Sequence, residues 1–336
     1  MTRVGVIGLG HWGPNHLRVF SQLGDSTVTV CCDSSQKRVE SLAAANKDIR
    51  FTTELDEMLA SDDLDAVVIA TPTATHFEVA TKALEAGKHV LCEKPLTEKV
   101  DESVKLAELA SEEGLVLSTG FVFLFNPGIR RLKQFVSNRE LGNIYYCSAV
   151  RTNLGPVRND VNCVFDLASH DISIFNYLLN SVPETVSASG QAFLQPEVED
   201  VAFITLKYPK NIVCSIRASW LDPRKVRQVT VVGDESMALW DDLGELGPVI
   251  LYDAGIVHEP YYESWGAFKM HARKGEVRVP NVPVEEPLRN QGQAFLNVLN
   301  NSEQNVCSPD FAVGITKVLC AINESMASNG KPISIK

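Results

Sequence analysis

A strand that runs into a glycine-rich turn near the start of the chain constrains the fold more than any other feature. Val4–Ile7 is a short apolar run, and residues 8–13 read Gly-Leu-Gly-His-Trp-Gly before a predicted helix over 15–23. A G-x-G-x-x-G pattern between a strand and a helix is typical of a dinucleotide site. The first glycine permits the tight turn, the second lets backbone approach a pyrophosphate, and the third allows close packing. The helix N-terminus favours the negative charge. The candidate cofactor-binding residues in this turn are Gly8, Gly10, His11, Trp12 and Gly13.

An acidic residue follows the second predicted strand, about twenty residues after the glycine turn. Asp33 directly follows the apolar run over 28–32. A carboxylate at this position can accept hydrogen bonds from adenosine ribose hydroxyls, and it repels a 2′-phosphate. The sequence therefore favours NAD over NADP. Lys37 and Arg38 are the opposing signal, because their charges can neutralise such a phosphate.

The first third of the chain alternates short apolar strands with helices. Further strands are predicted over 28–32, 66–70, 88–92 and 115–118, and helices over 36–45, 54–59, 76–85 and 100–113. Short apolar strands between helices indicate a parallel sheet that is covered on both faces. Right-handed crossovers then give a doubly wound fold. We predict an α/β chain whose first domain, over 1–120, is an NAD-binding Rossmann domain.

After about residue 120, strands follow one another without helices between them. Apolar and polar residues alternate over 212–220, which predicts a sheet with one more apolar face. Val229–Val232 and Met237–Trp240 flank Gly-Asp-Glu, which predicts a hairpin. We expect a second α+β domain over 121–336, with a large, mostly antiparallel open sheet, for substrate binding and oligomerisation. Its helices are predicted over 127–136, 163–179, 288–299 and 311–327.

Composition and charge argue against several classes of partner. The 336 residues include 31 Lys and Arg against 42 Asp and Glu, so the formal net charge is −11. Such a chain repels phosphate backbones and anionic lipid, so neither nucleic acid nor a membrane surface is an expected partner. No apolar run approaches the ~20 residues that a membrane span needs. Arg3 is followed directly by the short strand over 4–7 and the glycine turn, whereas the apolar segment of a secretory signal is longer and ends in small residues. We therefore expect a cytoplasmic protein.

The cysteine pattern predicts thiols rather than disulfides or a metal site. No two cysteines form a Cys-x-x-Cys pair, and most lie in apolar segments. We expect buried thiols in a reducing compartment and no structural zinc or other metal. The eight positions are Cys31, Cys32, Cys92, Cys147, Cys163, Cys214, Cys307 and Cys320.

Polar residues also end two further strands of the predicted parallel sheet. Thr71 and Pro72 stop the strand over 66–70, and Glu93-Lys94-Pro95 follows the strand over 88–92. Ligands of open α/β folds bind outside the carboxyl ends of their strands. Taken alone, a lysine at this edge is as compatible with a solvated surface group as with a functional one.

In combination, these motifs resemble the Gfo/Idh/MocA oxidoreductase family, and the resemblance covers nearly the whole chain. Residues 166–171 (Asp-Leu-Ala-Ser-His-Asp) match the D-x-x-x-H-D motif of that family's second domain. The other matching segments are the strand and glycine turn over 4–13, Ala70-Thr71-Pro72 with Thr75-His76, Cys92-Glu93-Lys94-Pro95, Glu286-Pro287-Leu288 and Gly330-Lys331-Pro332-Ile333.

The resemblance implies oxidation or reduction of a sugar or cyclitol carbinol by a nicotinamide dinucleotide. It implies that Lys94 and His170 lie beside the nicotinamide. It further implies that Thr71 and Pro72 lie against the cofactor and Glu93 near its nicotinamide side. His76, from the same motif as Thr71, is another candidate for cofactor binding.

The chemistry of alcohol oxidation agrees with these residue types. The cofactor accepts a hydride, and a base must take the hydroxyl proton. His170 suits that role because the pKa of histidine lies near neutrality. Asp166 precedes it by four residues, so a helix places both on one face, where Asp166 can orient the imidazole or bind a substrate hydroxyl.

Lys94 has two possible roles. It can hydrogen-bond the reacting oxygen and favour its alkoxide character, or act as the base if burial depresses its pKa. The sequence leaves both open. Lys94 and His170 belong to different predicted domains, so we expect the site to form where the domains meet.

Residues 151–162 carry the information on the substrate. This segment resembles members of the family that oxidise C3 of nucleotide-activated N-acetylhexosamines. Arg151 and Arg158 can pair with the pyrophosphate of a sugar nucleotide, and Asn162 with a sugar hydroxyl. Asn126, near the predicted domain junction, is a further substrate candidate. We therefore predict oxidation of C3 of a UDP-N-acetylhexosamine to the 3-keto sugar.

Other functions remain open at this point. They are an inositol or free-sugar dehydrogenase of the same family, an NAD-dependent glycoside hydrolase, and a non-catalytic NAD-binding regulator. A binding module needs neither Lys94 nor His170, so the presence of both residues argues against a non-catalytic regulator. A broad one-sided sheet must also cover its other face, so a homodimer or homotetramer is predicted.

Overall fold

The chain folds into two compact units in a computed structural model that describes residues 1–258 and 270–335. The first unit comprises Met1–Phe125 and Glu285–Cys320, and the second comprises Asn126–Val284 and Ala321–Lys336. The predicted division at residue 120 into two continuous domains is therefore wrong in one respect. The segment over 285–320 belongs to the first unit, because its apolar side chains pack there.

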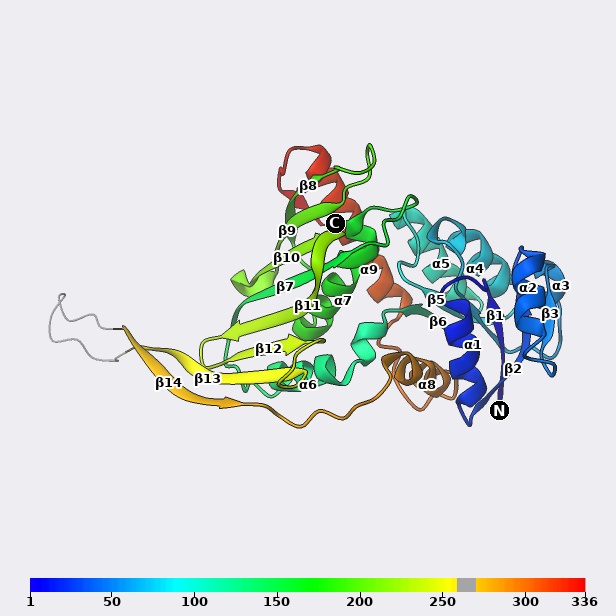
Figure 1. The fold of residues 1–336 in the computed structure, drawn as a ribbon, viewed down its shortest axis with the longest axis horizontal. Helices are drawn as coiled ribbons and strands as arrows, with labels where there is room; N and C mark the ends of the chain where they lie inside the picture. Colours follow the sequence, from blue (N-terminus) through cyan, green and yellow to red (C-terminus); the bar gives the residue numbers. More distant parts are fainter. Residues whose placement is uncertain (259–269, 336) are drawn as a thin grey trace. The chain divides into compact units, whose positions relative to one another are not determined.

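A six-stranded parallel sheet forms the centre of the first unit, in the order β3-β2-β1-β4-β5-β6 (Figure 1). Its strands are β1 (Thr2–Ile7), β2 (Ser26–Cys32), β3 (Arg50–Thr52), β4 (Ala66–Ile69), β5 (His89–Glu93) and β6 (Leu117–Gly120). Its helices are α1 (Gly13–Gln22), α2 (Gln36–Ala43), α3 (Leu55–Leu59), α4 (His76–Glu85), α5 (Val100–Glu112) and α8 (Pro287–Leu299), with short turns η1 (Thr73–Thr75) and η2 (Val122–Phe125). The strand order reverses between β1 and β4, which is the switch point where doubly wound sheets bind ligands. The predicted Rossmann-type sheet is confirmed.

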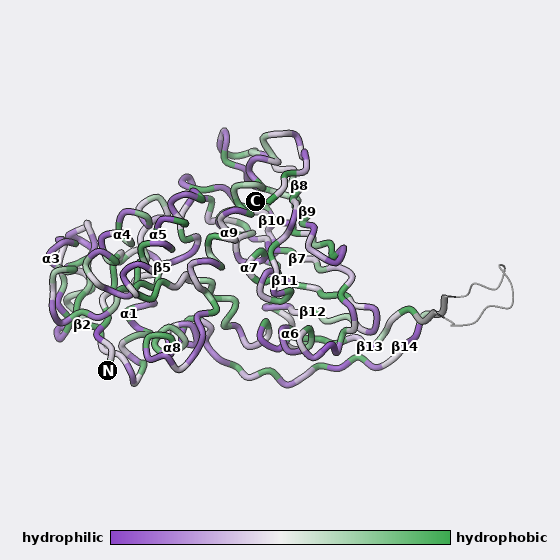
Figure 2. Tube along the Cα trace, turned by 180° about the vertical axis from the view of Figure 1, so that it is seen from behind, coloured by the Kyte–Doolittle hydropathy of each residue, from purple (hydrophilic) through white to green (hydrophobic). Residues whose placement is uncertain are grey.

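Helix α8 explains why the late segment belongs to this unit. Its Phe295 lies edge-on to Phe20 of α1, with ring centroids 6.5 Å apart. Both rings join a cluster that includes Val4 and Val6 of β1. In Figure 2 the traces of helices such as α4 and α5 change repeatedly between hydrophobic and hydrophilic colours. Such helices bury one stripe against a sheet and expose the other.

A nine-stranded sheet forms the centre of the second unit, in the order β14-β13-β12-β11-β7-β10-β9-β8-β15. The strands are β7 (Ile144–Leu154), β8 (Thr185–Gln191), β9 (Val201–Lys207), β10 (Val213–Ser219), β11 (Leu221–Gly233), β12 (Met237–Asp241), β13 (Val249–His258), β14 (Met270–Arg278) and β15 (Ile333–Ser334). Adjacent strands are antiparallel except β7 and β10, which are parallel. The predicted hairpin is confirmed, since Val232 of β11 pairs with Met237 of β12. The helices are α6 (Pro127–Ser137) and α7 (Ser169–Leu179), with a π-helical turn η3 (Val164–Ala168) and a 3₁₀ turn η4 (Pro209–Asn211); α9 (Pro309–Ala327) contributes residues to both units.

One face of this large sheet carries exposed side chains. In β9, Ala202, Ile204 and Leu206 are buried, whereas Phe203 is 57% exposed. Phe203 pairs with Arg217 of β10 and with Ser189 of β8. A groove of about 430 Å³ runs over the face and is lined in part by these three side chains.

Seven of the eight cysteines are buried thiols, as predicted, and Cys320 is half-buried. Burial raises the pKa of Cys31 to about 12 and that of Cys32 to about 11. Among the described residues, no helix combines the length and apolar character needed to cross a membrane. The same residues contain no group of three or more His, Cys, Asp or Glu side chains placed to hold a metal ion.

Candidate active site

Three of the predicted motifs follow neighbouring strands of the parallel sheet. In register, Ile7 of β1 lies opposite Ile69 of β4, and Ile69 lies opposite Cys92 of β5. The glycine turn, the Thr71–Pro72 turn and the 93–95 segment therefore all leave the sheet at its carboxyl edge. This is the edge at which an open α/β fold binds its ligand.

The glycine turn fits a dinucleotide by a steric test at each glycine. Gly8 has a φ of +90°, and a Cβ there would lie 2.7 Å from the carbonyl carbon of Ala70. A Cβ at Gly13 would lie 1.9 Å from the carbonyl oxygen of Gly8, so this glycine allows helix α1 to approach the turn. A Cβ at Gly10 would meet nothing within 4 Å. Gly10 thus leaves backbone open for close approach, as a pyrophosphate would require.

Asp33 supports the glycine turn. Its side chain is only 5% exposed, and Oδ2 accepts a hydrogen bond of 2.6 Å from the backbone N–H of Leu9. Oδ1 accepts one of 2.8 Å from Ser35, and Nη1 of Arg38 lies 3.4 Å from Oδ2. An ionised carboxylate has about four acceptor positions, so Asp33 can still accept from ribose hydroxyls. Arg38 is one of the two cations, with Lys37, whose charge could neutralise the 2′-phosphate of NADP.

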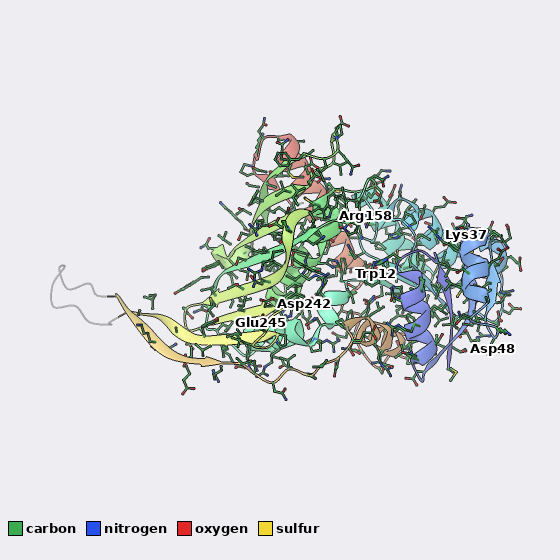
Figure 3. All side chains as sticks on the ribbon, viewed as in Figure 1. Trp12, Lys37, Asp48, Arg158, Asp242 and Glu245 are labelled. Atoms are coloured by element: carbon green, nitrogen blue, oxygen red, sulfur yellow. The ribbon has the colours of Figure 1, made fainter. Side chains whose placement is uncertain are left out.

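His11 and Trp12 lie exposed in the glycine turn. Their rings meet edge-on with centroids 5.6 Å apart. Trp12 is the N-cap residue of α1 and is 41% exposed (Figure 3). Lys37, also labelled in Figure 3, is exposed on α2.

Lys94 follows β5 directly, and its neighbour Glu93 is held by a buried histidine. His16 of α1 is 1% exposed, and its Nε2 lies 2.8 Å from Oε1 of Glu93. Oε2 of Glu93 accepts a hydrogen bond from the backbone N–H of Lys94 at 3.2 Å. Burial acts to raise the pKa of the Glu93 carboxyl, but the His16 hydrogen bond and the charges of His16 and Lys94 prevail and lower it. The Glu93 side chain is therefore a carboxylate, and its Oε1 can accept a hydrogen bond from Nε2–H of His16.

The interpretation of His76 as a cofactor ligand needs correction. The side chain is 1% exposed at the start of α4. Its Nδ1 lies 2.9 Å from the carbonyl oxygen of Pro95, and its Nε2 lies 3.0 Å from that of Thr71. Burial lowers the pKa of His76. Because both ring nitrogens face backbone carbonyls, His76 joins two turns instead of presenting a ring nitrogen to a ligand.

In the second unit, His170 lies in the first turn of α7 and is half-buried. The predicted continuous helix over 163–179 begins instead with the π-helical turn η3, which contains Asp166. A π turn bonds i to i+5, so the angular spacing of Asp166 and His170 is not that of an α-helix. Oδ2 of Asp166 accepts a hydrogen bond of 3.0 Å from Nε1 of Trp220, and Oδ1 lies 3.4 Å from Nη1 of Arg158.

Arg151 departs from its predicted role as a pyrophosphate ligand. It is 2% exposed, and Nε and Nη2 donate hydrogen bonds of 2.9 and 2.8 Å to the carboxylate of Asp171. A guanidinium so buried and paired is structural. Arg158 is more accessible, and its Nε lies 2.9 Å from Oδ1 of Asp160.

The two asparagines proposed for the substrate also have local structural contacts. The Asn126 side chain caps α6 by accepting from the backbone N–H groups of Gly128 and Ile129. Nδ2 of Asn162 donates to Glu199 at 2.8 Å and to Asn323 at 3.1 Å. The Asn162 contacts could not be predicted from the sequence, because Glu199 and Asn323 lie 37 and 161 residues away along the chain.

Sequence reasoning also missed His16 as a site residue. It lies three residues after Gly13, on the helix that the glycine turn opens. That spacing from the turn was the available signal, but only the packing of α1 shows the contact with Glu93. Asp171 is the last residue of the D-x-x-x-H-D motif, and the structure pairs it with Arg151.

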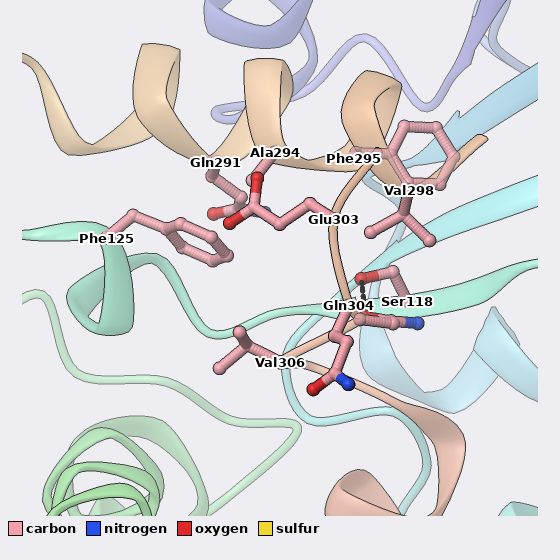
Figure 4. A pocket seen from close by; sticks show the side chains of 10 residues that line it. Ser118, Phe125, Gln291, Ala294, Phe295, Val298, Glu303, Gln304 and Val306 are labelled. Carbon is pink, nitrogen blue, oxygen red and sulfur yellow. Dashed lines mark hydrogen bonds between the residues drawn. The ribbon is translucent and has the colours of Figure 1, made fainter. Parts of the chain in front are cut away.

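A small cavity in the first unit is a separate feature. Figure 4 shows it between α8, the segment over 303–306 and Phe125, with Gln291 and Ser118 in its lining. Its volume of about 10 Å³ is at most enough to admit a single water molecule. A cavity of this size cannot hold a nicotinamide or a sugar.

Comparison with known families supports both units. Residues 2–121 match the oxidoreductase family with an NAD-binding Rossmann fold, GFO_IDH_MocA. Residues 129–239 match the GFO/IDH/MocA C-terminal domain.

The individual relatives are named for different activities. The UDP-N-acetylglucosamine 3-dehydrogenase of Acidithiobacillus ferrooxidans is 31% identical over 256 residues, which is 76% of this chain and 79% of that protein. An inositol 2-dehydrogenase of Rhodococcus erythropolis is 28% identical over 269 residues, covering 79% of this chain and 76% of its own. The uncharacterized oxidoreductase YrbE of Bacillus subtilis is 28% identical, and the match covers 63% of this chain and 65% of that protein. The solved structure of the Acidithiobacillus enzyme, GnnA, superposes with a TM-score of 0.82 at 25% identity, over 97% of this chain and 98% of that one.

Proposed function

Since this chain belongs to the Gfo/Idh/MocA oxidoreductase family and has its NAD-binding Rossmann domain, we propose that it oxidises a secondary alcohol of a sugar, most specifically C3 of a UDP-N-acetylhexosamine. The product is the 3-keto sugar. The observation that carries the substrate assignment is the 31% identity to a UDP-N-acetylglucosamine 3-dehydrogenase over 79% of that relative's length. The resemblance of the segment over 151–162 to enzymes that oxidise nucleotide-activated N-acetylhexosamines supports the same substrate class.

The cofactor, when bound, accepts the hydride from the carbinol carbon. The backbone around Gly10, the carboxylate of Asp33 and the Thr71–Pro72 turn would hold it at the carboxyl edge of the parallel sheet. Lys94, which follows β5 at that edge, hydrogen-bonds the reacting oxygen through Nζ and stabilises negative charge there. His170 takes the hydroxyl proton on its imidazole.

Arg158 is the cation that supports a nucleotide-linked substrate. Its side chain is partly exposed and is held by Asp160 at 2.9 Å, with Asp166 at 3.4 Å. A guanidinium fork can exchange such carboxylate partners for the oxygens of a pyrophosphate. Arg151 is left out of this role, because it is buried against Asp171.

Oxidation of inositol is the second candidate function. Relatives named inositol 2-dehydrogenase match this chain at 28% and 34% identity. A cyclitol offers the same secondary alcohol without a pyrophosphate. The two candidates therefore differ in whether a uridine nucleotide contributes to binding.

The deciding experiment incubates the purified protein with NAD and a panel of UDP-sugars, free sugars and inositols. NADH absorbance and a keto product are measured together. Turnover of a UDP-N-acetylhexosamine, with binding of UDP to the cofactor-free protein, is the expected result. Turnover of inositol without UDP binding would replace the proposal by the second candidate, and sugar release without net NADH would indicate a glycoside hydrolase.

Assembly and location complete the proposal. We infer that the exposed face of the nine-stranded sheet around Phe203 is covered by a second copy, which gives a homodimer or homotetramer. The net charge of −11 and the buried thiols support a cytoplasmic protein with a small-molecule substrate and no nucleic-acid partner.

A further inference from the structure

We propose that two buried histidines, His16 and His76, position Lys94 by holding the residues on either side of it. This inference rests on the proposed role of Lys94 at the reacting oxygen. His16 contacts Glu93, which precedes the lysine, and His76 contacts Pro95, which follows it. The two histidines come from different helices, α1 and α4, so the lysine's segment is held from two elements.

The first contact links the lysine to the glycine turn. His16 lies on α1, three residues after Gly13, and its Nε2 is 2.8 Å from Oε1 of Glu93. The other carboxylate oxygen of Glu93 accepts the backbone N–H of Lys94. The absence of a side chain at Gly120 makes room for this arrangement, since a Cβ there would lie 3.2 Å from Glu93. The carboxylate is therefore placed by His16 and in turn holds the backbone at Lys94.

The second contact links the lysine to the Thr71–Pro72 turn. Nδ1 of His76 is 2.9 Å from the carbonyl oxygen of Pro95, and Nε2 is 3.0 Å from that of Thr71. A neutral imidazole carries one N–H and donates to one of these carbonyls at a time. His76 is thus shared between a turn that is a candidate cofactor contact and the segment that carries Lys94.

Neither histidine is placed to exchange protons with a substrate. Both are 1% exposed, and Nε2 of His16 and both ring nitrogens of His76 face protein atoms. Their contribution is geometric, and it acts through the backbone of 93–95. A displacement of a catalytic group by about 1 Å can cost about 10²-fold in rate, so loss of these contacts is expected to show in kcat.

The test uses the shapes of asparagine and glutamine. The asparagine amide nitrogen can occupy the place of histidine Nδ1, and the glutamine amide nitrogen the place of Nε2. His16 contacts Glu93 through Nε2, so we expect His16→Gln to retain more kcat than His16→Asn. His76 contacts Pro95 through Nδ1, so we expect the opposite order, with His76→Asn retaining more than His76→Gln. The worse variant at each position should lose about tenfold or more in kcat, with the Kd for NADH changed less than threefold.

His89 is the matched control. It begins β5, at the other end of the strand that precedes Lys94, and its Nδ1 accepts the backbone N–H of Val116 at 2.9 Å. His89→Asn and His89→Gln should leave kcat within threefold of the wild type. Unfolding midpoints are measured for all six variants, so that a general loss of stability is recognised.

A second readout needs no cofactor. Acetylation of Lys94 by acetic anhydride is followed by mass spectrometry in the cofactor-free protein, with exposed Lys37 as the internal reference. The Lys94 to Lys37 labelling ratio should change at least threefold in His16→Asn and His76→Gln and stay constant in both His89 variants. An unchanged ratio together with kcat losses no larger than those of the His89 variants would overturn the inference. The same order of Asn and Gln at both histidines would also overturn it, and if one position yields no folded variant, the order at the other decides.

Lys94→Met separates this inference from the proposed function. Near-normal turnover of Lys94→Met with a confirmed substrate removes the lysine from the reaction, whatever the labelling shows. A second outcome is that Lys94→Met is inactive while the His16 and His76 variants keep wild-type kcat and wild-type labelling of Lys94. That outcome would leave the proposed reaction standing and would remove only the positioning role of the histidines.

Discussion

Arg151 and Asp171 form a buried ion pair joined by two hydrogen bonds, from Nε to Oδ2 at 2.9 Å and from Nη2 to Oδ1 at 2.8 Å. Asp171 directly follows His170 in the first turn of α7, and Arg151 lies on β7 near the middle of the large sheet. The pair therefore anchors the start of the His170 helix to the sheet. Burial raises the pKa of Asp171, and the charge and hydrogen bonds of Arg151 oppose that rise.

Removal of Arg151 should destabilise the protein strongly. Arg151→Met leaves the Asp171 carboxylate buried without its partner, and we expect a loss of about 3–5 kcal/mol in the free energy of unfolding. Urea unfolding measures it. Arg50→Met is the control, because Arg50 lies 3.9 Å from Glu57 in an exposed pair and should cost about 0–1 kcal/mol. Equal losses in the two variants would show that burial of the pair is unimportant.

The proposed catalytic residues should affect rate more than cofactor binding. We expect Lys94→Met and His170→Asn each to lower kcat by about 10²–10⁴, because each removes a group aimed at the reacting oxygen or its proton. NADH fluorescence should report a nearly unchanged Kd, since the glycine turn is untouched. Lys99→Met, at an exposed lysine paired with Glu102, serves as the control and should behave as wild type. Loss of both binding and rate would point to a folding defect.

The pH dependence of kcat should identify the base. An imidazole accepts a proton only when neutral, so a histidine base predicts that kcat falls about tenfold per pH unit below about 6.5, the ordinary pKa of histidine. The residual activity of His170→Asn should lack this fall. Persistence of the same acidic limb in that variant would assign it to another group and leave Lys94 as the candidate base.

The wild type should prefer NAD to NADP because of the charge of Asp33. Asp33→Asn keeps an oxygen for the Leu9 N–H but removes the charge, so the ratio of the Kd values for NADP and NAD should fall. Isothermal titration with each cofactor measures it. Arg38→Gln is the companion variant and should weaken NADP alone. Tighter binding of NADP than NAD by the wild type would mean that Arg38 or Lys37 outweighs the carboxylate.

The exposed sheet face should hold an oligomer together. Phe203→Asp places a charge in the groove over β8, β9 and β10, and it should shift the protein toward monomers in light scattering at micromolar concentration. Val277→Asp on β14 is the control, because it adds the same charge at an exposed position near the opposite edge of the same sheet. A monomeric wild type at that concentration would refute the assembly.

Much of the fold, including the glycine turn, could be predicted because its signals are local. Strand β4 and helix α4 follow from apolar runs and periodicity within about ten residues each. The glycines at 8 and 13 reflect the backbone geometry of one turn, and the placement of Lys94 follows from its position directly after a strand. The division of the chain was less predictable, because the apolar stripe of α8 is compatible with either unit until its packing against Phe20 is known.

The sequence by itself determined the alternating α/β pattern, the glycine turn and the order of Thr71, Lys94 and His170 along the chain. Only the tertiary structure decided that His16 meets Glu93, 77 residues away, that His76 joins Thr71 to Pro95, and that Arg151 is buried on Asp171. The physical reason is that a polar side chain looks the same in sequence whether it meets a ligand or a distant protein partner. Burial and the position of the partner settle that choice, and both arise from packing between elements rather than from the local chain.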